Sequence, residues 1–174
     1  MIDFRGGLDQ THLALGIHAP SFSNKKKYAS ELFNAILGEG MSSRLFSEVR
    51  EKRGLAYTIR SLIDCERNYG SRIIYAGIEK KNIKKVKEII LKEIKKMIKL
   101  NAKDLEEAKE QKIGNYELGL EVCDGVATNL ALQEISTKAE DFYNYVNEIL
   151  NVSLKDVREM AKIKNYSFAV LAPK

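Results

Sequence analysis

Cysteine and histidine are scarce in this sequence, with two of each among 174 residues. Cys65 and Cys123 lie far apart and form no Cys-x-x-Cys pair, so we interpret both as reduced, small apolar residues, and nothing in the pattern requires a disulfide. His12 and His18 are six residues apart in one predicted strand, which separates their Cα atoms by roughly 20 Å. They cannot bind one metal ion together, and we interpret them as surface or partly buried side chains.

Long apolar runs are also absent. No run approaches the roughly 20 residues that a membrane-spanning helix needs, so we expect no membrane span. The first residues, 1–7, have neither the apolar core nor the cleavage site of a signal peptide, so we expect a cytoplasmic location. We interpret the chain as a fragment of a longer protein, and the alternative is a naturally separate small subunit. Without any internal repeat, linker or low-complexity segment, residues 1–174 are expected to form a single domain.

Positive charge exceeds negative charge, with a net charge of +5 and a pI near 9.1. Much of the excess lies between Lys80 and Lys99, where lysines follow one face of an amphipathic helix. We interpret this face as solvated, because the sequence has no arginine–aromatic interleaving and no recognised nucleic-acid module. A nucleic-acid partner is therefore not expected.

Apolar periodicity predicts a mixed order of strands and helices. In residues 11–18 the apolar side chains alternate, which predicts a strand closed by Pro20. Further elements are expected at 28–36 (helix), 57–65 and 71–79 (strands joined by a hairpin loop), 82–99, 101–120, 124–134, 137–149 and 153–160 (helices), and 166–171 (strand). Because strands come first and last and helices lie between them, we predict an α+β fold in which helices cover one face of an antiparallel sheet.

The stretch from Gly38 to Tyr57 organises the rest of the chain. Two glycines end one apolar helix, and Ser42 or Ser43 can cap the next, short helix. Gly54 is expected to end that short helix in a left-handed conformation, immediately before a strand. These two direction changes determine where Arg50 and Tyr57 point.

The segments Gly38–Phe46 and Arg50–Tyr57, with the motifs Gly-x-Gly-Met-Ser-Ser-Arg-Leu-Phe and Arg-Glu-Lys-Arg-Gly-Leu-Ala-Tyr, resemble the C-terminal half of the pitrilysin/insulinase-type zinc peptidases. Mitochondrial processing peptidase belongs to that group. The motif is long and nearly ungapped, and the resemblance is strongest over residues 10–65. It implies a processing-peptidase-like metallohydrolase domain.

The resemblance implies a division of labour between two halves. In the family, zinc is bound in the other half by a His-x-x-Glu-His motif, which this chain lacks, so zinc would come from a zinc-bearing N-terminal half or partner subunit. This chain would have no metal ligand and no general base, and would be inactive alone. Arg50 and Tyr57 match the family residues that reach toward the substrate, where they would bind the peptide or stabilise an oxyanion. His12 and His18 could line the same chamber.

The implied function is the substrate-binding, chamber-forming half of a zinc metalloendopeptidase that cleaves extended peptides. The alternative is a non-catalytic scaffold subunit of the same fold, and retention of Arg50 and Tyr57 argues mildly against it. Considered without the motif, Arg50 would be a helix C-terminal charge and Tyr57 an ordinary strand residue. Ser42 and Ser43 have no histidine base in a recognisable arrangement, so we do not expect a serine hydrolase. An exposed inter-domain face would make the isolated chain prone to form a homodimer.

Overall fold

A five-stranded sheet forms the base of the molecule in the computed structural model, which describes all residues from 1 to 174. Its strands are β1 (Ile2–Arg5), β2 (Thr11–His18), β3 (Ala56–Cys65), β4 (Gly70–Ile78) and β5 (Ser167–Pro173), in the spatial order β1-β5-β2-β4-β3. Three of the four strand pairs are antiparallel, and β1 pairs with β5 in parallel. The predicted antiparallel sheet is confirmed apart from this parallel edge strand, which the sequence prediction missed.

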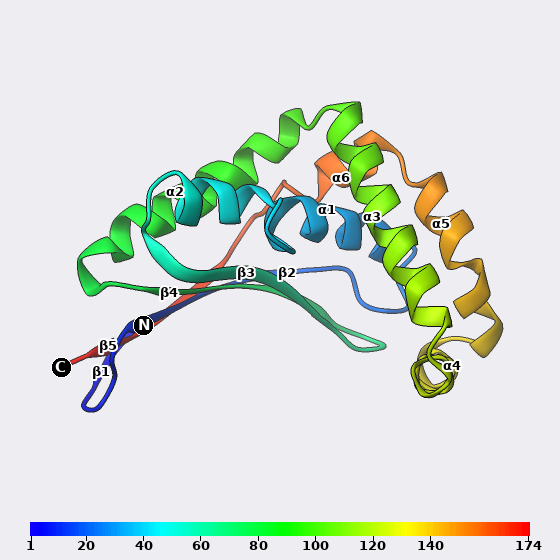
Figure 1. The fold of residues 1–174 in the computed structure, drawn as a ribbon, viewed down its shortest axis with the longest axis horizontal. Helices are drawn as coiled ribbons and strands as arrows, with labels where there is room; N and C mark the ends of the chain where they lie inside the picture. Colours follow the sequence, from blue (N-terminus) through cyan, green and yellow to red (C-terminus); the bar gives the residue numbers. More distant parts are fainter.

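The helices lie on one face of this sheet, which confirms the predicted α+β fold (Figure 1). They are α1 (Lys27–Gly38), α2 (Ile83–Lys96), α3 (Ala102–Leu120), α4 (Cys123–Ser136), α5 (Tyr145–Asn151) and α6 (Leu154–Glu159), with a π-helix η1 (Phe46–Glu51) and the 3₁₀ turns η2 (Lys80–Asn82), η3 (Met97–Lys99) and η4 (Ala139–Asn144). In Figure 1, α1, α2 and α6 lie above the sheet, and α3, α4 and α5 are grouped at one end. The lower face of the sheet carries no helix.

Strand β2 explains why the sheet is covered on one face only. Its alternate residues Leu13, Leu15 and Ile17 are almost completely buried and face the helices. The residues between them, including Ala14 and Gly16, lie on the open face. One continuous core of 28 buried residues joins the covered face to the helices. A buried polar pair also joins β3 to α1 in this core: the Ser61 hydroxyl of β3 donates a hydrogen bond to Oδ1 of Asn34 in α1 at 2.6 Å.

The long helices follow the predicted pattern. In α2, the side chains of Val86, Ile90 and Ile94 form the buried stripe, while the lysines of the same helix lie toward solvent. Helix α3 begins after Asn101, whose Oδ1 accepts a hydrogen bond from the backbone N–H of Asp104 at 2.8 Å. The prediction that this helix starts with Asn101 as its N-cap is therefore confirmed.

Two other predicted caps are wrong. The Ser43 hydroxyl donates to the carbonyl oxygen of Gly40 at 2.7 Å and therefore closes the preceding turn, and no side chain caps η1. The sequence Thr137-Lys138-Ala139-Glu140 also predicts a capping box at the start of the helix expected at 137–149, but Oγ1 of Thr137 accepts a hydrogen bond from Gln133 of the preceding helix. In both places the hydroxyl is hydrogen-bonded to a group that precedes it in the chain and does not cap the helix that follows.

Candidate functional site

The stretch from Gly38 to Tyr57 forms a compact unit at the end of α1. Gly40 has a φ of 80° and Gly54 a φ of 59°, so both glycines occupy the left-handed region that other residues disfavour. After η1 the N–H of Gly54 donates to the carbonyl of Arg50 at 2.9 Å, and the N–H of Leu55 donates to that of Val49 at 3.0 Å. This backbone network ends the helix and directs the chain into β3, as the glycine pattern predicts.

The structure brings Arg50 and Tyr57 side by side. The guanidinium carbon of Arg50 lies 5.8 Å from the centre of the Tyr57 ring and 5.0 Å from that of Phe46. Tyr57 is the extra residue of a β-bulge between Ala56 and Thr58, and it is 79% exposed. A bulge turns a side chain out of the regular alternation of its strand, so this geometry aims the Tyr57 ring outward beside Arg50.

The Arg50 side chain makes no ion pair, in contrast to its neighbours. Glu48 instead pairs with Lys52 at 2.6 Å and with Arg53 at 2.6 Å, and these hydrogen bonds lower the pKa of Glu48 to about 2. Arg50 keeps its five N–H donors for other partners, since its contacts within the chain are to aromatic rings. Chemically, an exposed guanidinium beside a phenol can bind a carbonyl or carboxylate oxygen of another molecule.

A cavity of about 530 Å³ opens next to Tyr57, between the start of β3 and the ends of β2 and β4. Gln10, Glu79 and Lys80 line it together with Tyr57. The cavity therefore has polar walls and reaches the position of the Tyr57 ring. Arg50 does not line this cavity.

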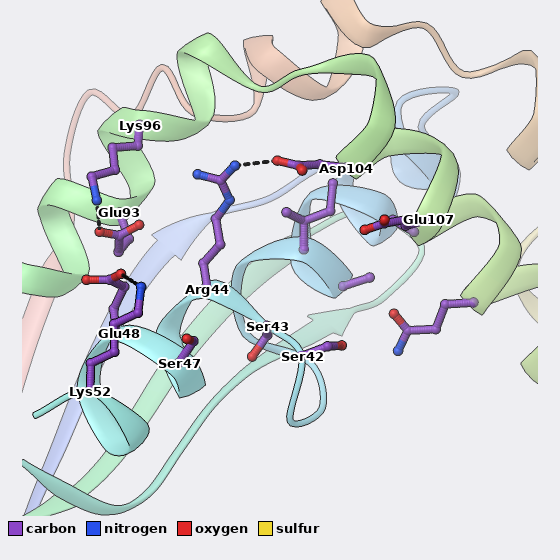
Figure 2. A pocket seen from close by; sticks show the side chains of 14 residues that line it. Ser42, Ser43, Arg44, Ser47, Glu48, Lys52, Glu93, Lys96, Asp104 and Glu107 are labelled. Atoms are coloured by element: carbon purple, nitrogen blue, oxygen red, sulfur yellow. Dashed lines mark hydrogen bonds and ion pairs between the residues drawn. The ribbon is translucent and has the colours of Figure 1, made fainter. Parts of the chain in front are cut away.

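A second cavity, of about 570 Å³, lies behind η1 and is walled by α2 and α3 (Figure 2). Its charged side chains pair with one another: Arg44 with Asp104, Lys96 with the buried Glu93 at 2.6 Å, and Lys52 with Glu48. Every cation here has a carboxylate partner, and the pair of Arg44 with Asp104 joins the residues just before η1 to α3. Ser42, Ser43 and Ser47 also line this cavity, and no histidine does, so it lacks the base of a serine hydrolase.

The residues of this chain do not fit a zinc ion. His12 lies on the open face of the sheet, where its Nδ1 is 2.7 Å from the hydroxyl of Tyr75, and His18 is exposed at the end of β2. No group of three or more histidine, cysteine, aspartate or glutamate side chains is close enough to hold a metal. Both cysteines are unpaired, and the Cys65 thiol donates to the carbonyl of Pro20.

A cluster that sequence reasoning missed lies at the other end of the molecule. A cavity of about 370 Å³, which we call the aromatic pocket, is formed where α1, α3, α4, η4 and α5 meet. Its aromatic walls are the rings of Phe22, Tyr28, Tyr116, Phe142 and Tyr145. Each of these residues falls on a predicted helix or loop, but they come from five segments that only the tertiary fold brings together. No local spacing could have signalled the pocket.

Comparison with known proteins places these features in a family. The family described as "Peptidase M16 inactive domain" matches residues 3–112, which is more than half of the chain. The chain belongs to the peptidase M16 family. It is an inactive C-terminal domain of that family, so the resemblance to zinc peptidases noted in the sequence is confirmed.

Relatives within the M16 family are longer than this chain. The uncharacterized zinc protease YmxG of Bacillus subtilis is 29% identical over 171 residues, and an uncharacterized zinc protease of Mycobacterium tuberculosis H37Rv is 30% identical over 171 residues. These matches cover 95% of this chain but 42% and 39% of the relatives. The chain therefore spans about two fifths of the length of the curated relatives it matches.

Solved structures agree with the M16 fold. A protease from Helicobacter pylori and the peptidase M16 inactive domain from Pseudomonas fluorescens both match with a TM-score of 0.87, at 22% and 21% identity. Each match covers 99% of this chain and 43% or 42% of the other chain. At this identity the likeness establishes the fold alone. None of the helices here combines the length and the apolar character needed to cross a bilayer.

Proposed function

We propose that this M16 domain is the substrate-binding, chamber-forming half of a zinc-dependent processing endopeptidase that cleaves extended peptides. Zinc and the general base would come from a zinc-bearing half, in the same protein or in a partner subunit. The observation that carries the proposal is the exposed Arg50–Tyr57 pair, in which the two side chains lie together and neither is committed to an ion pair.

Arg50 and Tyr57 would act on the carbonyl oxygen of the bound peptide. The guanidinium would donate two N–H groups, and the Tyr57 hydroxyl one O–H group, to an oxygen that gains negative charge during cleavage. Such donors accelerate a reaction when they are held in place before the charge develops. The backbone network around Gly54 and Leu55 holds η1 and the start of β3 in register and therefore holds the two side chains near one another.

The test is cleavage of a peptide by this domain reconstituted with its zinc-bearing half. Arg50→Ala and Tyr57→Phe should each lower kcat by about 10²-fold, which is the usual effect of removing one oxyanion donor. Arg67→Ala, in the exposed hairpin between β3 and β4, is the matched control and should leave kcat unchanged. Thermal unfolding of each variant separates this effect from loss of structure.

An unchanged kcat for both Arg50→Ala and Tyr57→Phe would remove the catalytic role and favour the scaffold alternative. In that case the domain would contribute only shape and contacts to the zinc-bearing half. Stable variants with a lower kcat would support the proposal, because a scaffold does not need the two side chains.

Exposed apolar surface bears on how the isolated chain assembles. Large apolar side chains are exposed around α4 and the end of α3, among them Leu118, Leu132 and Ile135 at 64%, 54% and 71%. Exposed apolar surface of this kind favours association with another protein. We therefore expect the isolated chain to form a homodimer at high concentration, which size-exclusion chromatography with light scattering measures. Addition of the zinc-bearing half should reduce the dimer.

A further inference from the structure

The aromatic pocket is chemically different from both cavities near η1. It lies at the end of the molecule where α3, α4 and α5 are grouped in Figure 1, and no residue of η1 or β3 lines it. The ring of Tyr116 stacks on that of Tyr145 with 4.9 Å between centres, and its other neighbour is Phe142 at 5.3 Å. These packed rings give the pocket rigid walls with electron-rich faces.

Carboxyl groups add negative charge to these walls. Glu31 on α1 projects into the pocket, where its Oε2 accepts a hydrogen bond from the Tyr145 hydroxyl at 3.0 Å. Asp141 lines the same space and forms no ion pair there. A third carboxylate, Glu39, is neutralised because both its oxygens lie 2.8 Å from the ammonium of Lys112. Burial raises the pKa of Glu31, while the nearby ammonium of Lys112 and the hydrogen bond from Tyr145 favour its charged form. Glu31 and Asp141 are therefore the two carboxyl groups of the pocket that have no ion-pair partner and can attract a cation.

A cation of the chain itself already stands in this position. The ammonium nitrogen of Lys27 lies 3.9 Å from the centre of the Phe22 ring and 4.9 Å from that of Tyr28. It has no carboxylate within ion-pair distance, and burial lowers its pKa despite the nearby Glu31 and Asp141. Lys27 is thus held mainly by ring faces, and a long lysine side chain can swing out to water at little cost.

We propose that the aromatic pocket binds an organic cation, the guanidinium or ammonium group of a basic side chain or small amine, which displaces the ammonium of Lys27. Rings and unpaired carboxylates together are the surroundings that bind such groups in proteins, and a planar guanidinium can both stack on a ring and hydrogen-bond a carboxylate. Glu31 and Asp141 supply the acceptors, and Phe22 and Tyr116 supply ring faces. The inference does not depend on the role of Arg50 and Tyr57.

Isothermal titration calorimetry of the 174-residue chain with arginine amide tests the proposal. N-acetylnorleucine amide, which has an alkyl side chain and no charged group, is the ligand control and should not bind. Lys27→Met removes the internal competitor and should tighten binding of arginine amide by about fivefold, the value of one modest cation–π contact. Lys25→Met, an exposed lysine two residues away that does not line the pocket, should leave the affinity unchanged.

Two further substitutions address the walls. Glu31→Gln keeps the shape and the hydrogen bond from Tyr145 but removes the charge, and should weaken binding by about tenfold. Tyr116→Leu removes a ring face and should weaken binding by about fivefold, whereas Tyr116→Phe keeps the face and should bind as the unaltered chain does. Thermal unfolding of each variant confirms that the fold is retained.

The outcomes show which kind of cation the pocket binds and whether the pocket is a binding site at all. Equal binding of arginine amide and of the blocked tripeptide Ala-Arg-Ala would assign the pocket to a side chain within a peptide, and binding of arginine amide alone would assign it to a free small amine. Absence of binding to both the unaltered chain and Lys27→Met would overturn the proposal. So would equal affinities in Lys27→Met, Glu31→Gln and the unaltered chain, because binding would then occur elsewhere.

Discussion

Gly38, the last residue of α1, is predicted to tolerate no side chain. A Cβ atom added there would lie 2.6 Å from the Cβ of Ser61 and 2.8 Å from its backbone nitrogen. Carbon atoms in protein interiors stay about 3.5–4.0 Å apart, so α1 and β3 would have to separate by about 1 Å. Gly114, inside α3, is the matched control, because a Cβ there would meet no atom within 4 Å.

The two glycine-to-alanine changes should therefore have opposite signs. Overpacking of this kind costs about 1–3 kcal/mol, and the forced separation also strains the hydrogen bonds between Asn34 and Ser61, so Gly38→Ala should destabilise the domain by about 2–3 kcal/mol. Gly114→Ala should stabilise it by about 0.5–1 kcal/mol, because alanine loses less conformational entropy in a helix.

Urea unfolding followed by circular dichroism measures both changes as shifts of the midpoint at constant slope. Two results would refute the reasoning. One is a Gly38→Ala variant as stable as the unaltered chain, which would mean that α1 and β3 are less closely packed than described. The other is a destabilised Gly114→Ala variant, which would mean that the sign is not decided by the space around the glycine.

Two charged residues give further predictions. Arg72 is buried, and its guanidinium donates to the hydroxyl and the carbonyl oxygen of Ser30 and lies 4.4 Å from the centre of the Phe33 ring. Burial lowers the pKa of Arg72 to about 10, so the charged form costs roughly 3 kcal/mol in the folded state. Arg72→Met should therefore stabilise the domain by about 1–2 kcal/mol in the same urea assay, and a loss of stability would contradict this. Its hydrogen bonds with Lys52 and Arg53 lower the pKa of Glu48 to about 2 in the folded chain, below the ordinary value of about 4.3. These pairs therefore stabilise the fold fully at a pH above 4.3, and this stabilisation is lost as the pH falls toward 2. Glu48→Gln should flatten this acid limb of the stability curve slightly, since the pairs are partly screened by solvent.

Local pattern predicted most of this fold because its elements carry strong local signals. The alternation in β2 and the apolar stripe of α2 each require one face to be buried, and the structure buries those faces. Strand β1 was missed because its partner β5 comes from the opposite end of the chain, and four residues with no clear period give no local signal. The π-helix η1 was expected as an ordinary short helix, since Leu45, Phe46 and Val49 do not distinguish one helical pitch from the other.

The candidate site was predictable to a different extent. The glycine pattern predicted that the chain turns sharply before and after Arg50, and both Gly40 and Gly54 have positive φ. It could not predict the β-bulge that turns Tyr57 outward, because a bulge depends on the register between β3 and β4. The aromatic pocket could not be predicted from the sequence either, because only tertiary packing brings its walls together.

The position of Arg50 is determined by the backbone around it, and its side chain contributes little to the stability of the fold. Its place is determined by backbone groups, namely the positive φ of Gly54 and the N–H of Leu55 bonded to the carbonyl of Val49, while its own side chain contacts only the ring faces of Phe46 and Tyr57. Substituting the Arg50 side chain therefore costs little folding free energy, whereas replacing Gly54 would change the position of Arg50. A residue that the fold positions but does not use for its own stability is available to bind another molecule, and this is the physical basis for the proposal that Arg50 contacts the substrate.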